Sequence, residues 1–312
     1  MCLPLYGRKR HKVFVSNKYI HSQTNNLNVM KTRSIAKIIY APTFDMGGLP
    51  IRQPLPSSEL DYLDPFVLLH HGHVIMDKDM DLKRAGVGPH PHRGFSPVTF
   101  VFKGGTHHRD SRGNDHKVFE GGTQWMHAGM GIIHSERPLE PEMEIIQMWI
   151  NTPAKQKMDQ PMYFPLSKEE TPQFVSEDKL IEVNVVTGNL LDIKGPIPTM
   201  TPINSAMLHI SKNGTLEIPL PKNHHAFLYL LDGKLNLGED TEVVGKKLIV
   251  FANDGDSITI KGLEDTRALL MSGEPIGEKI VAQGPFVMNN ETQLMEAYRD
   301  ARMGKMGVLI ED

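Results

Sequence analysis

The chain is predicted to be an all-β protein made of two β-sandwich or barrel domains. Three observations predict this class. Short apolar runs recur from about Ile35 onward, turn residues (Gly, Pro, Asn, Asp) separate them roughly every eight to twelve residues, and long helical patterns are few. A length of 312 residues suggests about two domains. A hydrophobic content of 39% is sufficient for two packed cores.

The first half contains four clear strand patterns, at residues 38–40, 66–69, 98–102 and 145–150. Pro153, Pro161 and Pro165 then interrupt a charged stretch, which indicates a connection between the two halves. We therefore place the first domain at residues 30–160 and a linker at residues 161–180.

The second half repeats this organisation, with strand patterns at 181–186, 206–210, 226–230, 247–251 and 257–260. Asp232-Gly233 predicts a hairpin turn, and it resembles residues 102–105, as an internal duplication would produce. We place the second domain at residues 181–288. In the final segment, 289–312, Asn290 and Gln293 resemble a capping box, and Gly304 is a stop signal, so a helix is expected from about 291 to 303.

Residues 1–29 differ from the rest of the chain, because they carry five basic residues and no acidic one. They are predicted to be a disordered basic tail, with an organelle transit peptide or a small nucleic-acid-binding arm as alternatives. The remainder has 29 basic and 37 acidic residues, a formal charge of −8. A body this acidic argues against direct binding to nucleic acid.

The composition also bounds the cellular setting. Cys2 is the single cysteine, which excludes an intrachain disulfide and fits the reducing cytoplasm. No stretch approaches the ~18 consecutive apolar residues that a membrane helix requires. We therefore expect a soluble cytoplasmic protein with no membrane partner.

Two short pairs of metal-ligating residue types are the most informative feature of the sequence. One residue separates His90 from His92, and one separates His134 from Glu136. Residues i and i+2 of a β-strand point to the same face, so each pair can present two ligands from one strand. Three imidazoles and one carboxylate suit a divalent first-row ion, and four protein ligands leave open positions of the kind that catalytic sites have. Because the chain has 15 histidines, a solvated chance pair is the alternative.

The residues around these pairs resemble the two metal motifs of the pirin family, whose members are bicupins. The two blocks are G-P-H-P-H-R-G-F at residues 88–95 and Q-W-M-H-A-G-M-G-I-I-H-S-E at residues 124–136. Further similar stretches are D-P-F at 64–66, H-R-D-S at 108–111 and G-P-F-V-M-N at 284–289, so the resemblance extends over roughly residues 31 to 305.

This resemblance implies two cupin domains, with a C-terminal helix that packs back on the first. It also implies one ion, held by His90, His92, His134 and Glu136; iron is the expected metal, and nickel, copper, manganese and zinc are alternatives. The chain departs from the family pattern at Ser96, where many pirins keep a glutamate, and at His127, where threonine is usual. His127 either reaches the metal pocket or faces solvent, and we expect the latter.

The second half has no such combination of pairs. His224 and His225 are adjacent, and neighbouring residues of a strand point to opposite faces. We therefore expect a degenerate second cupin and one metal site, in the first half.

Some pirins are similar to quercetin 2,3-dioxygenases, which implies a flavonol or similar small aromatic substrate together with dioxygen. On this hypothesis Glu136 is the catalytic proton acceptor, oxygen adds across the activated ring, and carbon monoxide leaves. Two alternatives stay open. One is a non-enzymatic co-regulator, in which the redox state of the metal alters a surface that docks a protein partner. The other is a zinc-dependent hydrolase or isomerase. The turn at 108–110 either supports the metal ligands or is solvated.

Overall fold

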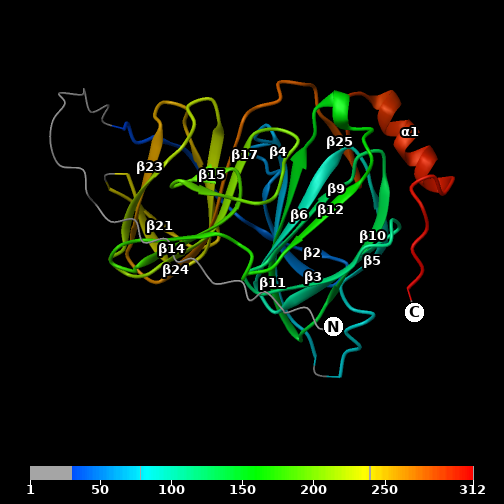
Figure 1. The fold of residues 1–312 in the computed structure, drawn as a ribbon, viewed down its shortest axis with the longest axis horizontal. Helices are drawn as coiled ribbons and strands as arrows, with labels where there is room; N and C mark the ends of the chain where they lie inside the picture. Colours follow the sequence, from blue (N-terminus) through cyan, green and yellow to red (C-terminus); the bar gives the residue numbers. More distant parts are fainter. Residues whose placement is uncertain (1–29, 78, 239, 312) are drawn as a thin grey trace, which may run out of the picture.

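The protein folds into two β-sandwich halves that lie side by side. The computed structural model describes residues 30–311 except 78 and 239, so the predicted basic tail at 1–29 lies outside the described residues. Each half consists of one seven-stranded sheet and one four-stranded sheet. In Figure 1 the N-terminal half lies on the right and the C-terminal half on the left, and the helix α1 lies against the outer side of the N-terminal half. The predicted all-β bicupin class is confirmed.

The N-terminal half forms around two antiparallel sheets. Its seven-stranded sheet runs, in spatial order, β12 (Met162–Leu166), β9 (Thr123–His127), β6 (Phe95–Lys103), β11 (Glu142–Asn151), β4 (Phe66–Ile75), β3 (Leu49–Leu55) and β2 (Thr43–Met46). Its four-stranded sheet runs β5 (Val87–His92), β10 (Ile132–Pro138), β7 (Gly105–Asp110) and β8 (Asp115–Phe119).

The C-terminal half repeats this plan. Its seven-stranded sheet runs β1 (Ile35–Tyr40), β22 (Lys247–Phe251), β19 (His225–Asp232), β24 (Thr266–Gly273), β17 (Ile203–Ile210), β14 (Ile181–Thr187) and β13 (Gln173–Val175). Its four-stranded sheet runs β18 (Thr215–Pro219), β23 (Ser257–Gly262), β20 (Lys234–Leu237) and β21 (Thr241–Val244). Two small ribbons complete the described strands: β15 (Asn189–Leu190) with β16 (Ile193–Lys194), and β25 (Val281–Gln283) with β26 (Phe286–Met288).

Near the boundary between the halves, some segments join a sheet other than the one that their position in the sequence suggests. Strand β1, which the sequence assigned to the first domain, instead pairs with β22 at the edge of the C-terminal sheet. The predicted linker at 161–180 contains β12, an edge strand of the N-terminal sheet, and β13, an edge strand of the C-terminal sheet. The connection is therefore part of both sandwiches.

The two seven-stranded sheets pack against each other through one apolar cluster. It draws Phe66, Phe100 and Met148 from the N-terminal half and Phe227 and Leu269 from the C-terminal half. The rings of Phe66 and Phe227 meet edge to face, with centroids 5.1 Å apart. Side chains alternate along a strand, so these sheets bury their other faces inside their own halves.

One local prediction was wrong in an instructive way. The Asp232-Gly233 turn does not join a hairpin, because β19 pairs with β22 and β24 while β20 pairs with β21 and β23. The turn carries the chain from one sheet to the other. Gly104 does the same between β6 and β7, and both glycines have a positive φ, of 76° and 72°. The two halves therefore also share the glycine-containing turn that connects their seven-stranded and four-stranded sheets.

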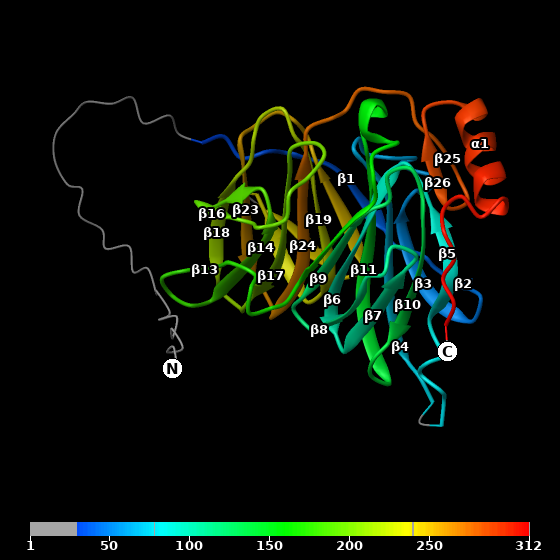
Figure 2. The same ribbon diagram turned by 45° about the vertical axis from the view of Figure 1, so that its right-hand side comes forward.

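The C-terminal segment returns to the N-terminal half, as predicted. Helix α1 (Glu291–Arg302) begins at Asn290, whose side chain accepts a hydrogen bond from the Gln293 amide. Leu294 and Ala297 are buried against Phe286 of β26 and Met306. Figure 2 shows α1 beside β25 and β26, close to β5. Among the described residues, no helix is long and apolar enough to cross a membrane.

Candidate metal site

Strands β5 and β10 bring the two predicted ligand pairs together. His90 and His134 are direct partners across the antiparallel ladder, and His92 is paired with Ile132. The centroids of the three rings lie 4.3 Å (His90 to His134), 4.7 Å (His90 to His92) and 5.0 Å (His92 to His134) apart. Cross-strand partners and i, i+2 neighbours share one face of a sheet, so the three imidazoles necessarily gather there.

The Nε2 atoms of the three histidines point to a common centre. His90 Nε2 lies 3.1 Å from His92 Nε2. Two nitrogens bound at right angles to one ion, each at about 2.1 Å, would lie about 3.0 Å apart. His134 Nε2 is buried and has no hydrogen-bond partner among the described residues. The three histidines each offer a ligand atom within 4.8 Å of the others. A buried, unpaired nitrogen is costly, so this geometry fits a bound ion.

The other ring nitrogen of each histidine is held by the protein. His90 Nδ1 lies 2.8 Å from the Gly88 carbonyl oxygen, and His92 Nδ1 lies 3.1 Å from the Pro285 carbonyl oxygen. An Nδ1–H that donates to a carbonyl leaves Nε2 deprotonated and free to bind a metal. The supporting carbonyl at Pro285 comes from the C-terminal segment, which thus contributes to the site.

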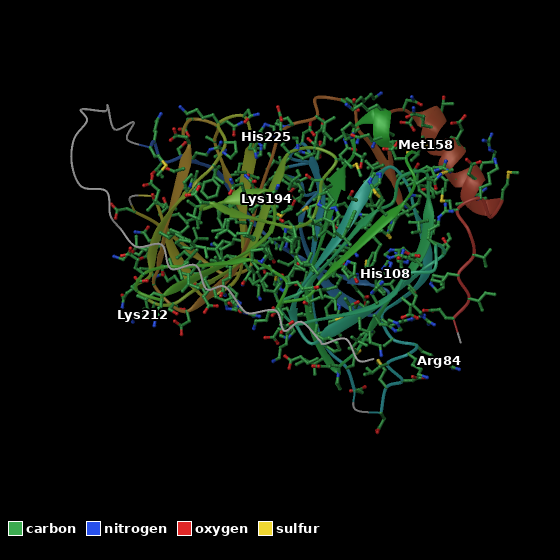
Figure 3. All side chains as sticks on the ribbon, viewed as in Figure 1. Arg84, His108, Met158, Lys194, Lys212 and His225 are labelled. Carbon is green, nitrogen blue, oxygen red and sulfur yellow. The ribbon has the colours of Figure 1, made fainter. Side chains whose placement is uncertain are left out.

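His134 is supported by a second histidine. Its Nδ1 lies 3.4 Å from His108 Nδ1, and His108 Nε2 lies 3.1 Å from Asp110 Oδ2. The His108 ring stacks on Tyr163, with centroids 4.0 Å apart and planes at 8°. In Figure 3, His108 lies among the strands of the N-terminal half. Asp110 and His108 are both buried. Residues 108–110, which were expected to form a turn, are the end of β7, and His108 and Asp110 support His134 from within the fold.

Burial keeps the imidazoles of His92 and His134 neutral. It lowers the pKa of His92 to about 3, with a smaller contribution from His90. Burial also lowers the pKa of His134 well below its usual value. A neutral imidazole has the lone pair that a metal needs, so the site requires no proton release at neutral pH.

Glu136 lies apart from the group of three nitrogens. A register shift separates it from His134 on β10. Thr99 donates to its Oε1 at 2.9 Å, Gln124 also donates to Oε1, and Gln147 donates to Oε2 at 2.8 Å. Glu136 lines the same cavity as His90 and His92. The structure thus places it at the site, and its ligation of the metal stays a prediction.

The cavity above the histidines is mostly apolar. It has a volume of about 270 Å³ and lies between the inner faces of the two sheets of the N-terminal half. Its polar residues include His70, His90, His92, Glu136 and Gln147, and its apolar walls include Met46, Leu49, Ile51, Val74, Met76, Val87, Met143, Ile145 and Trp149. An apolar pocket with a few convergent polar groups is typical of a small-molecule site.

Sequence reasoning missed the polar residues that support Glu136. Thr99 interrupts the apolar run 98–102 of β6, and Gln147 interrupts the apolar run 145–150 of β11; these interruptions were the available signal. A polar residue on an inward-facing strand position needs a partner, because a buried polar group without one is costly.

A buried lysine fastens the first motif to the C-terminal segment. Lys157 Nζ donates to the carbonyl oxygens of Gly94, at 2.6 Å, and Val287, at 2.9 Å, and to Asn151 Oδ1 at 2.6 Å. Gly94 has φ +87°, and a Cβ there would lie 2.1 Å from the Val287 oxygen. Only glycine permits this close approach, which holds the histidine strand in place.

The expected orientation of His127 was wrong. This side chain is buried, not solvent-facing, and its Nδ1 lies 3.3 Å from the Ser96 hydroxyl. The two departures from the family pattern therefore contact each other. Five consecutive buried residues, 123–127, show that β9 is covered on both faces, which a pattern of alternation does not predict.

The comparisons with known proteins agree with this geometry. Residues 48–150 match the pirin family, and residues 206–307 match the pirin C-terminal cupin domain. Pirin-like protein 2 of Arabidopsis thaliana is 34% identical over 285 residues, which cover 88% of this chain and 86% of that protein.

Two solved structures extend the comparison. A quercetin 2,3-dioxygenase from Acinetobacter baumannii superposes with a TM-score of 0.83 at 28% identity, covering 90% of this chain and all (100%) of that one. A bacterial pirin from Escherichia coli, solved in complex with nickel(II), has a TM-score of 0.60 at 17% identity and covers 77% of this chain and 98% of its own. At this identity, the Escherichia coli structure shows that the two proteins share a fold.

Proposed function

Because the chain belongs to the pirin family of bicupins, we propose that it is a metal-dependent oxygenase of the quercetin 2,3-dioxygenase type. The observation that carries this proposal is the convergence of three imidazoles, two of which, His90 and His92, line an apolar cavity of about 270 Å³. The likeness to a quercetin 2,3-dioxygenase at 28% identity supports the choice of chemistry.

In this proposal His90, His92 and His134 hold one divalent first-row ion, and Glu136 is the fourth ligand. Iron is the proposed metal; nickel, copper, manganese and zinc share the same ligand preferences. When bound, such an ion supplies a Lewis acid and open coordination positions. The single cysteine, Cys2, supports a reducing cytoplasmic setting for this chemistry.

Glu136 is the proposed proton acceptor for a substrate hydroxyl. Its carboxylate is held by Thr99, Gln124 and Gln147, all neutral donors, which fix its position without neutralising its charge. Gln147 is itself oriented, because the Trp149 indole donates to its Oε1 at 3.1 Å. A carboxylate placed in this way can take a proton at Oε1 or Oε2.

The apolar walls select the substrate class. Trp149, Met143 and Ile145 alternate along β11 and face the cavity together. These surfaces suit a flat aromatic molecule and exclude water from the reacting centre. A flavonol, which carries an acidic hydroxyl on a planar ring system, fits both the polar floor and the apolar walls.

The test begins with elemental analysis of protein purified in air-free buffer, followed by measurement of oxygen uptake and carbon monoxide release with quercetin. We expect about one ion per chain, turnover, and a loss of at least 100-fold in kcat for Glu136→Gln. Glu140→Gln is the matched control, because Glu140 is exposed on the loop after β10. It should leave turnover unchanged.

Other outcomes would replace the proposal. Bound iron without oxygen uptake, together with a copurifying protein, would support a non-enzymatic co-regulator. Zinc as the bound ion, without oxygen uptake, would support a hydrolase or isomerase.

A further inference from the structure

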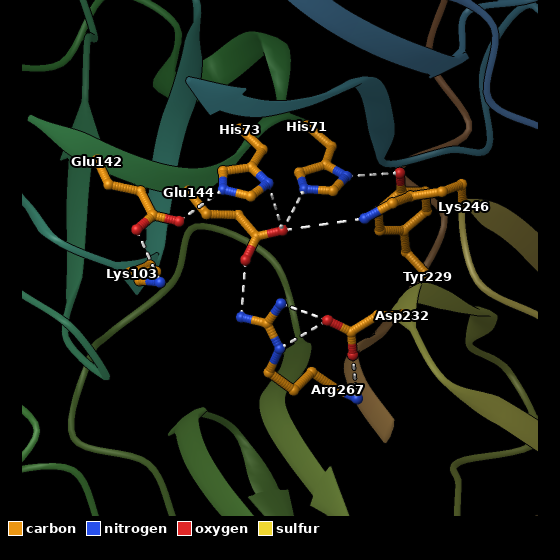
Figure 4. A network of polar contacts seen from close by, with 9 residues as sticks. All are labelled: His71, His73, Lys103, Glu142, Glu144, Tyr229, Asp232, Lys246 and Arg267. Carbon is orange, nitrogen blue, oxygen red and sulfur yellow. Dashed lines mark hydrogen bonds and ion pairs between the residues drawn. The ribbon is translucent and has the colours of Figure 1, made fainter. Parts of the chain in front are cut away.

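A second cavity lies between the two halves, on the opposite side of the sheet from the metal pocket. Its volume is about 170 Å³. It is lined by Thr43 of β2, Pro50 and Arg52 of β3, His71 and His73 of β4, and Lys246 from the turn before β22. Figure 4 shows most of the polar groups around it, with Lys246 and Tyr229 approaching His71 from the C-terminal half.

Strand alternation separates this cavity from the metal pocket. On β4, His70, Gly72 and Val74 line the metal pocket, whereas His71 and His73 line the second cavity. On β3, Leu49 and Ile51 face the former, and Pro50 and Arg52 face the latter. On β2, Met46 faces the former and Thr43 the latter, so the two cavities share a wall of three strands and no lining residue.

The permanently charged residues that line the second cavity, Arg52 and Lys246, are both cations. Next to this lining, Arg267 faces two carboxylates, Glu144 and Asp232. Both carboxylates already have a cationic partner in Arg267. Its guanidinium pairs with Asp232, and its Nη1 lies 2.7 Å from Glu144 Oε2. Asp45 also lies on β2, and its carboxylate accepts a hydrogen bond from the Gly48 amide.

His71 does not add to this charge. His71 is bonded at both ring nitrogens, to Tyr229 at 2.9 Å and Glu144 at 3.1 Å. Burial lowers its pKa, so it is neutral at neutral pH. His73 lies 3.0 Å from Glu142, which also pairs with Lys103 at 2.8 Å.

Arg52 and Lys246 retain donors on the cavity side. Lys246 Nζ is 3.9 Å from Glu144 Oε1, which is beyond hydrogen-bond distance. Arg52 donates through Nη1 to the Ala41 carbonyl at 3.2 Å, and a guanidinium carries five N–H donors in all. Burial lowers the pKa of Lys246; the carboxylates of Glu144 and Asp232 oppose this effect, and the weaker repulsion from Arg52 and Arg267 adds to it. A bound anion would compensate the ammonium group for the water that it loses on burial.

We propose that this interdomain cavity binds a small multivalent oxyanion, of the phosphate or dicarboxylate class, between Arg52 and Lys246. The volume equals that of roughly five or six water molecules, which accommodates a four-oxygen anion. Arginine and lysine provide charge-assisted hydrogen bonds to such oxygens. Because Arg52 belongs to the N-terminal half and Lys246 to the C-terminal half, the anion joins the two halves and stabilises the folded chain.

Isothermal titration calorimetry on the full chain tests this proposal. Inorganic phosphate and malonate are the two probes, titrated separately at constant ionic strength set with sodium chloride, because surface attraction depends on salt. We expect one saturable event per chain, and a loss of affinity of about tenfold or more for Arg52→Gln and for Lys246→Asn. Asparagine suits position 246, where φ is +69°. The tighter of the two probes identifies the oxyanion.

Two matched variants control the experiment. Lys246→Arg keeps the charge and should retain binding. Lys212→Asn removes a lysine at the outer edge of the C-terminal half, as Figure 3 shows, and should also bind as the wild type does.

A phosphate ion could also bind a metal, so the titration is repeated with His134→Asn. Binding that survives His134→Asn and weakens in Arg52→Gln and Lys246→Asn supports the interdomain site. Binding that is lost in His134→Asn alone, that is equal in all variants, or that does not saturate with either probe overturns it.

Discussion

The interiors of the two halves differ although their strand plans match. Between its sheets the N-terminal half holds three histidines, Glu136 and a cavity of about 270 Å³. Between its sheets the C-terminal half holds a continuous cluster of buried aliphatic side chains, including Leu208, Leu228 and Ile260. The polar pair His224 and Ser272 remains at its margin, 3.1 Å apart. One scaffold thus encloses a cavity beside a histidine cluster in one half and a packed core in the other.

This difference shows where the stability of the fold lies. Apolar burial contributes about 25 cal/mol for each Å² removed from water, and the C-terminal interior obtains it in full. The N-terminal interior gives up part of this burial for its cavity. Its sheet is instead stabilised from behind, where Phe66, Phe100 and Met148 pack against the C-terminal half. The packed C-terminal half therefore supports the half that contains the cavity.

The largest expected effect is the loss of bound metal when a histidine of the N-terminal half is replaced, compared with no loss when a histidine of the C-terminal half is replaced. His134→Asn removes the buried Nε2 at the centre of the site, so we expect the bound metal to fall from about one ion per chain to near zero. His209→Asn, on an exposed position of β17 in the C-terminal half, is the control and should leave the metal content unchanged. Elemental analysis measures both. Full metal content in His134→Asn would show that the ion binds elsewhere.

Truncation of one aliphatic side chain in each interior sharpens the comparison of packing. Leu228→Ala creates a void in the packed core and should lower the free energy of unfolding by about 3 kcal/mol. Ile145→Ala only enlarges an existing cavity, so its cost should be about 1 kcal/mol. Chemical denaturation followed by fluorescence measures both values. Equal losses would mean that the N-terminal interior is as tightly packed as the C-terminal one.

Asp110→Asn tests the support behind His134. An amide cannot hold the His108 tautomer that leaves His108 Nδ1 as an acceptor, so metal affinity should fall about 10- to 100-fold. Asp115→Asn is matched in chemistry, because Asp115 pairs with His107 on the exposed side of the same ribbon at 2.6 Å. Competition with a chelator measures the affinity of each variant. An unchanged affinity in Asp110→Asn would contradict the positioning role.

The smallest expected effect concerns the C-terminal segment. The Arg137 guanidinium hydrogen-bonds Glu311 and, with help from Arg109, lowers the pKa of that carboxyl from 4.5 to about 2. A lowered pKa in the folded state means that this contact stabilises the protein above about pH 4.5 and is lost as the pH falls toward 2. The melting temperature of the wild type should therefore fall more steeply below pH 4.5 than that of Glu311→Gln. Glu296→Gln, an exposed change on α1, should follow the wild type.

Local patterns predicted much of the fold. The runs at 98–102 and 226–230 became parts of β6 and β19, because apolar β-branched and aromatic residues between turns have few alternatives to a strand. The helix near 291–303 was also predicted, since its cap residues act within one turn. Patterns could not predict that β1 crosses to the C-terminal sheet, because strand pairing depends on residues distant in sequence.

The candidate site divides in the same way. The sequence alone determined the metal-ligating residue types and, through the i, i+2 spacing of His90 and His92, the face on which that pair lies. Only the tertiary structure decided that His134 stands opposite His90, that His108 and Pro285 hold the Nδ1 atoms of His134 and His92, and that His127 is buried. Spacing within a strand is set by the covalent chain, whereas contacts between strands are set by the packing of the whole sandwich.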